Sequence, residues 1–298
     1  MQTRFRCGSR RLGAGVVKAG VIMATVLLGG CGGSSGPLGG NATAQHLTCA
    51  TTCTPSNTVD ISELRANYVL VDNTQSMQAL ASFGTGHDPR ANVEVTGGDQ
   101  IQLTTVQGAQ PFELPSANIG AIVADAILSL FTGAPPYTSA VNATELASPV
   151  QFQFIRGTTT YSSSISLAPA FTIAAPAGGS VLALSNPVIA VRLTNAAITP
   201  VQSATLNCTD ANGNTASSTP TVPIQGSPTV DATGMSYFAD FGPALNSLTF
   251  TTTNPRGAIA NCAISLTITL QTSGQAAVGM PLVQISGQRA RSVSFTME

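Results

Sequence analysis

Apolar and polar residues alternate along most of the chain after residue 60. Gln151-Phe152-Gln153-Phe154 is the clearest example, and residues 264–270 repeat the pattern over a longer stretch. A period of two places alternate side chains on opposite faces of a strand, so the pattern predicts half-buried β-strands. Further runs of this kind occur at residues 77–83, 93–96, 189–193 and 292–297. Turn signals rich in Gly and Asn separate the runs, at residues 84–86, 97–99, 212–214 and 254–257.

Many short strands with regular turns predict an all-β fold, and we expect two tandem β-sandwich domains of the immunoglobulin-like kind. A stretch rich in Ala, Pro and Gly at residues 172–180 divides the body into residues 48–172 and 173–298. Each half is close to the common domain size. Neither half can contain the core tryptophan of antibody domains, because the chain has no Trp.

One segment departs from the alternation. Residues 117–130 carry apolar side chains at helical spacing, and Ser116 precedes them as a candidate N-cap. We expect a short helix at the edge of the first sandwich, with a buried pair of strands as the alternative.

The N-terminus has the organisation of an export signal. Residues 1–18 hold five of the 12 basic residues of the chain, and residues 19–28 form an apolar run. This run is too short to span a bilayer, which requires about 20 residues, but it suits the core of a signal peptide. The run ends in Leu28-Gly29-Gly30-Cys31.

This ending resembles the bacterial lipobox, in which small residues precede a cysteine that is acylated and becomes the new N-terminus. The resemblance implies a signal peptide at residues 1–30, cleavage between Gly30 and Cys31, and a lipid on Cys31 that anchors the protein in a membrane. Gly32, in place of Asp, implies the outer membrane of a Gram-negative cell. Residues 31–47 are rich in Gly and Ser and predict a flexible tether. A plain secretory signal with a coincidental cysteine is the alternative.

Four cysteines lie beyond the lipobox: Cys49, Cys53, Cys208 and Cys262. An exported protein meets an oxidising compartment, so we expect two disulfides, for which three pairings are open. We favour Cys49–Cys53 with Cys208–Cys262, because Cys208 and Cys262 each lie in phase with the apolar positions of a predicted strand. As an alternative for the first pair, the two thiolates with His46 are suited to copper or zinc, although a fourth ligand is not evident.

The composition of the chain excludes two classes of binding function. Charged residues make up 8% of the chain, against about 25% in a typical protein. Beyond residue 30 there are seven arginines, 13 acidic residues and no lysine. Such a body has no basic surface for nucleic acid, and it cannot form the lysine-ending loop that cradles nucleotide phosphates.

No catalytic residue can be assigned. A nucleophile and its base require a positioned histidine, but His46 lies in the tether and His87 lies beside Asp88 in a Gly-rich turn. The acidic residues are scattered, and no Gly-x-Ser-x-Gly motif occurs in the body. Residues 210–214 resemble the start of a calcium loop, but its twelfth position is Thr221 rather than an acid, so we expect a hairpin turn. We therefore expect no enzyme activity, no cofactor and no bound metal.

Two stretches resemble a group of Gram-negative lipoproteins with no assigned activity: residues 91–103, ANVEVTGGDQIQL, and residues Asn261 to Phe295. The resemblance implies a β-sandwich fold and an envelope location. We expect a lipid-anchored cell-envelope protein, on the periplasmic face or at the cell surface, that acts as a binding or structural module. An envelope hydrolase or a metal-handling protein is the alternative.

Overall fold

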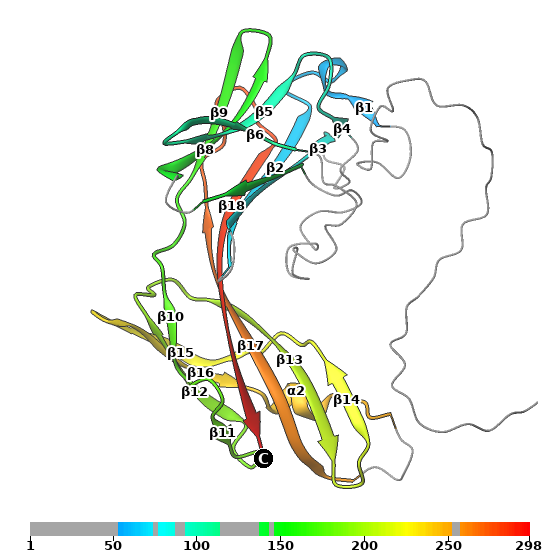
Figure 1. Ribbon diagram of the computed structural model, residues 1–298, viewed down its shortest axis with the longest axis vertical. Helices are drawn as coiled ribbons and strands as arrows, with labels where there is room; N and C mark the ends of the chain where they lie inside the picture. Colours follow the sequence, from blue (N-terminus) through cyan, green and yellow to red (C-terminus); the bar gives the residue numbers. More distant parts are fainter. Residues whose placement is uncertain (1–52, 74–76, 87–92, 114–136, 143–145, 252–256) are drawn as a thin grey trace, which may run out of the picture. The chain divides into compact units, whose positions relative to one another are not determined.

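The computed structural model describes residues 53–73, 77–86, 93–113, 137–142, 146–251 and 257–298 (Figure 1). Most of their regular structure is β-strand, which confirms the predicted all-β sandwich fold. Within these ranges the helical elements are η1, a single 3-10 turn at Ser56–Thr58, and α2 at Gly242–Asn246. The helix predicted at 117–130 lies outside the described residues.

An eight-stranded sheet extends through both halves of the fold, and we call it the central sheet. Its strands are β2 (Leu64–Asp72), β3 (Met77–Thr85), β7 (Tyr137–Val141), β11 (Val181–Leu182), β13 (Val201–Asp210), β14 (Thr215–Ser218), β17 (Ile259–Ser273) and β18 (Val283–Met297). They are ordered β14-β13-β17-β18-β2-β3-β7, and β11 also pairs with β18. The two longest strands, β17 and β18, pair antiparallel, and β18 pairs in parallel with β2. The last strand therefore links strands from both halves of the chain.

Two four-stranded sheets pack against the central sheet. The N-terminal sheet has the order β6-β5-β8-β9 and the C-terminal sheet the order β10-β12-β16-β15. Their strands are β5 (Gln100–Thr105), β6 (Gly108–Pro111), β8 (Leu146–Arg156), β9 (Thr159–Ile165), β10 (Thr172–Ala175), β12 (Val188–Thr194), β15 (Ile224–Asp231) and β16 (Gly234–Asp240). Ile285 packs in one core and Phe295 in the other. Because alternate residues of a strand share a face, both sheets cover the same face of β18.

Each sandwich has its own hydrophobic core. The N-terminal core draws on residues between 59 and 165, together with Ala277, Met280 and Ile285. The C-terminal core draws on residues from Ala168 to Met297. The division between residues 172 and 173 that the sequence favoured stays a prediction. Ala168 and Phe171 already pack in the C-terminal core, and β18 contributes to both cores.

The alternation seen in the sequence decides which side chains enter the core. Phe152 and Phe154 of β8 are fully buried, whereas Gln151 beside them is half-buried. Phe152 stacks on Tyr68 of β2 with ring centroids 4.9 Å apart, and Phe154 packs on Phe83 of β3 at 5.6 Å. This aromatic cluster holds the N-terminal sheet against the central sheet, since large rings bury the most apolar area.

Candidate functional site

The predicted cleavage site, Gly30–Cys31, and with it the predicted lipidation residue Cys31 lie outside the described residues, and so does Cys49. Cys53 is described and is disulfide-bonded; its pairing with Cys49 stays a prediction. No group of three or more His, Cys, Asp or Glu side chains in the described ranges could hold a metal ion. The helices of these ranges are also too short or too polar to cross a membrane.

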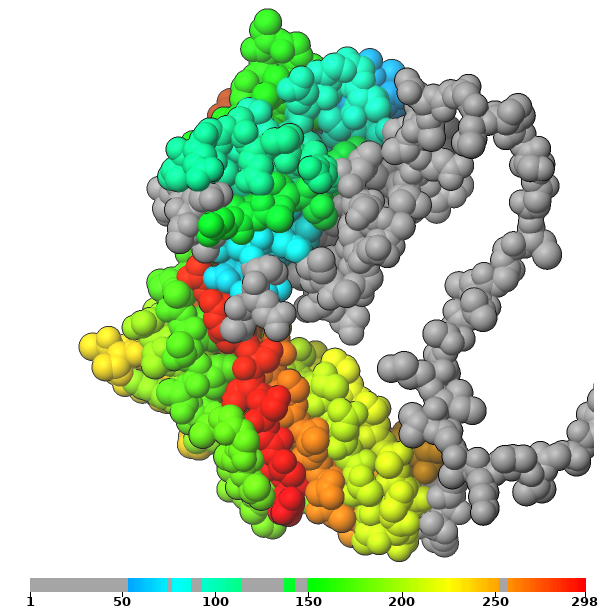
Figure 2. Space-filling model, in the orientation of Figure 1, coloured from blue at the N-terminus to red at the C-terminus, as the bar shows by residue number. Residues whose placement is uncertain are grey.

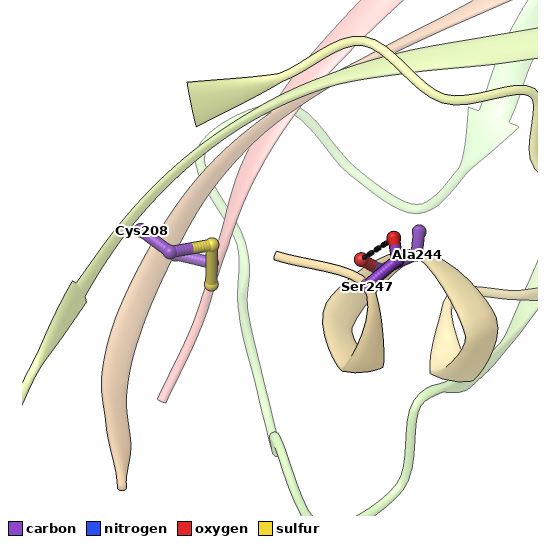
Figure 3. The surroundings of a disulfide bond; sticks show 4 residues. Cys208, Ala244 and Ser247 are labelled. Atoms are coloured by element: carbon purple, nitrogen blue, oxygen red, sulfur yellow. Dashed lines mark hydrogen bonds between the residues drawn. A yellow bond between two sulfur atoms is a disulfide. The ribbon is translucent and has the colours of Figure 1, made fainter. Parts of the chain in front are cut away.

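Cys208 and Cys262 form the predicted disulfide, with an S–S distance of 2.04 Å (Figure 3). They are direct partners in the pairing of β13 with β17, and both lie in the C-terminal core. The bond therefore joins neighbouring strands of one sheet, whereas the disulfide of immunoglobulin domains joins two sheets. Figure 3 also shows α2 near the bond, where the Ser247 hydroxyl donates a hydrogen bond to the Ala244 carbonyl at 2.9 Å.

The face of the central sheet that points away from the hydrophobic cores carries small, uncharged side chains on β13, β17 and β18. In Figure 2 these strands lie side by side as a continuous surface. Their registers align nine residues in three rows, Ser203–Thr267–Ser292, Thr205–Ser265–Ser294 and Asn207–Ala263–Thr296. We call these nine residues the hydroxyl face. Within each row, neighbouring residues lie about 4.8 Å apart, which is the distance between adjacent strands.

The side chains of the hydroxyl face are half-buried or exposed. The Thr267 and Ser292 hydroxyls share a hydrogen bond of 2.9 Å. Within the described part of the chain, no other polar side chain of this face has a hydrogen-bond partner. A hollow of about 330 Å³ lies over Thr205, Asn207 and Ser265. Since a hydroxyl both donates and accepts hydrogen bonds, the face offers a dense set of polar contacts without any charge.

Asp210 ends β13 and organises the turn into β14. Its Oδ1 accepts hydrogen bonds from the backbone N–H groups of Asn212 and Asn214 at 2.9 and 2.8 Å. Its Oδ2 accepts from the Gly257 N–H at 2.7 Å and from the Asn214 side-chain amide at 2.8 Å. Burial raises the pKa of Asp210, but these hydrogen bonds lower it to about 2. These hydrogen bonds hold the carboxylate in the turn between β13 and β14, which is the hairpin turn that the sequence predicts.

A second hollow, of about 360 Å³, lies beside Asp99, Phe112 and Tyr137. Both Asp99 oxygens accept a hydrogen bond from the Arg156 Nε at 3.1 Å, so the carboxylate is paired with a cation. Burial raises the pKa of the Tyr137 phenol, whose oxygen accepts a hydrogen bond from the Val95 N–H at 2.8 Å. The groups described around this hollow therefore include no nucleophile paired with a base.

Sequence reasoning missed both the hydroxyl face and the Asp99–Arg156 pair. The alternation that predicted the strands also contained the polar residues of the face, but it could not show that β13, β17 and β18 are neighbours. His46 and His87, the two histidines considered for catalysis, lie outside the described residues. Comparison of the chain with models of protein families, with curated proteins and with solved structures finds no match.

Proposed function

We propose that the protein is a lipid-anchored module of the bacterial cell envelope that binds or organises other envelope components, rather than an enzyme. The observation that carries the proposal is the hydroxyl face, which is uncharged. Among the described residues, six of its eight polar side chains make no hydrogen bond with another protein group. Such a surface suits a neutral, polar partner. Donors and acceptors on the two sides can then pair without the cost of desolvating a charge.

The N-terminal sequence supports the proposed location in the cell envelope. The lipobox-like residues 28–31 follow a basic segment and an apolar run, and a Gly-rich tether comes after them. A tether of this length has a random-coil reach of roughly 20–25 Å, which lets the body stand clear of the membrane. Gly32 supports the outer membrane as the destination. The acidic, lysine-free body adds no electrostatic attraction to anionic lipid headgroups, so the lipid must hold the protein.

Replacing Cys31 by serine is expected to release the protein from the membrane, because serine offers no thiol for lipidation. We expect metabolic labelling with palmitate to be lost and the protein to move to the soluble periplasmic fraction. Protease added to intact cells carrying the wild-type protein then distinguishes surface display from a periplasmic location. Firm membrane association of the Cys31→Ser protein would contradict the proposed anchor.

A charge placed in the middle of the hydroxyl face is expected to abolish binding. Ser265 is the central residue of the nine, and arginine there adds bulk and a cation that a neutral partner cannot pair. We expect Ser265→Arg to lose most of the cross-links that the wild-type protein forms in intact cells. Thr229→Arg, at an exposed position of β15, is the matched control and should keep them. Equal cross-linking of both variants would refute a role for this face.

A further inference from the structure

The described part of the chain begins with a short segment that has few apolar contacts. Residues 53–59 contain β1 (Thr54–Pro55) and η1, and β1 pairs with β4 (Val93–Glu94) over only two residues. Val59 is the one residue of this segment that packs in the N-terminal core. Apolar burial and backbone pairing therefore contribute little to holding the segment against the rest of the described body, so polar contacts supply most of the attachment there. Cys53 is also disulfide-bonded, to a cysteine outside the described residues.

Arg156, at the end of β8, supplies two of these contacts. Its Nη2 donates a hydrogen bond to the Ser56 carbonyl at 2.6 Å, and its Nη1 donates to the Val59 carbonyl at 2.8 Å. The same guanidinium forms an ion pair with Asp99, with Nη2 and Oδ2 2.7 Å apart, and the Asp99 side chain is only 2% exposed. The fork of the guanidinium thus binds the carboxylate and the segment at once.

Ser56 completes the network from inside the segment. It is fully buried, its hydroxyl donates to Asp99 Oδ2 at 2.8 Å, and its oxygen accepts a hydrogen bond from the Thr96 N–H at 3.0 Å. Gly97 has a positive φ of 67°, and a Cβ at this position would collide with the Asn57 side chain. Glycine therefore allows the turn after β4 to approach the segment closely.

From these contacts we infer that residues 53–59 are a separately fastened segment, which fixes the point where the tether leaves the folded body. Arg156 is the positioning residue that holds it. The inference rests on the proposed function in one respect: with a lipid on Cys31, any pull on the anchor acts first on this segment. Loss of Arg156 frees the segment and lengthens the tether, while the two sandwiches stay folded because only Val59 leaves the core.

Hydrogen–deuterium exchange on the full chain, purified from membranes in detergent, tests the inference. In Arg156→Gln we expect the amides of Thr54 and of residues 56–59 to exchange about 100-fold faster, since a buried carboxylate loses its cation and the segment opens locally. The amides of β17 should keep their wild-type rates. Arg192→Gln, which removes an arginine from an exposed pair with Asp231, is the matched control and should change neither set.

Ser56→Ala is a milder second variant, because it removes one hydroxyl and leaves the ion pair in place. We expect the same segment to exchange about 10-fold faster, because the variant loses the hydrogen bonds that the Ser56 hydroxyl makes with Asp99 and Thr96. Unchanged exchange at residues 54–59, or an equal rise in β17 in both variants, would overturn the inference. Palmitate labelling of Cys31 tests the anchor separately. If the amides of the segment exchange faster in Arg156→Gln but the protein carries no lipid, the result supports the fastened segment and refutes the anchor alone.

Discussion

Replacing Cys208 and Cys262 together by alanine is expected to lower the free energy of unfolding by about 4 kcal/mol. The disulfide joins residues separated by 54 positions in the sequence. In the chain-entropy model, closing a loop of this size removes conformational freedom from the unfolded chain and so stabilises the folded state. The loop contains β14, β15, β16 and α2, which make up much of the C-terminal sandwich. Urea unfolding followed by circular dichroism measures the loss.

The single variants provide the control for this experiment. Cys208→Ala and Cys262→Ala each break the same bond, so each should lose nearly as much stability as the double variant, and the losses should be strongly non-additive. Two single losses that sum to the double loss would mean that side-chain packing, and not the covalent link, is what stabilises the fold. A loss in the double variant below about 1 kcal/mol would contradict the loop-closure account.

The alternation of the sequence predicted strands well because burial on one face imposes a period of two on each strand. The same phase argument placed Cys208 and Cys262 on core-facing positions, and the bond between them is confirmed. The phase of the alternation shows which face of a strand is buried, but it does not show which strand lies next to it. For this reason the sequence could not show that the two cysteines lie on adjacent strands of one sheet.

The partners of β18 illustrate the same limit. Residues 292–297 were predicted as a strand from their alternation, but nothing in the pattern indicates that residues 283–289 pair in parallel with β2 at the other end of the chain. The role of Arg156 could not be predicted either, because its partner Asp99 is distant in the sequence and an ion pair produces no periodic pattern of residues. Contacts between distant segments depend on how the sheets assemble, which local patterns do not encode.

Asp72→Asn is expected to destabilise the protein by about 3 kcal/mol, because two arginines lose their shared carboxylate. Asp72 ends β2, and its Oδ2 lies 2.6 Å from the Arg289 Nε and 3.3 Å from the Arg291 Nη2. The three side chains are 13 to 20% exposed, so water screens them poorly. The arginines also reach the C-terminal core: Arg289 donates to the Ala168 carbonyl at 2.7 Å, and Arg291 lies over the Phe171 ring.

Through Arg289 and Arg291, Asp72 links β2 to residues of the C-terminal core. A comparison with an exposed ion pair tests whether this link stabilises the protein. In the Arg192–Asp231 pair the Asp231 side chain is 54% exposed, so Asp231→Asn should leave the urea midpoint nearly unchanged. Arg291→Met keeps an unbranched chain over Phe171 and removes one cation, so it should recover part of the stability lost in Asp72→Asn. If Asp72→Asn lost no more stability than Asp231→Asn, the charges of Asp72, Arg289 and Arg291 would be solvated in the folded protein. The junction between the cores would then depend on the continuous strands β17 and β18 alone.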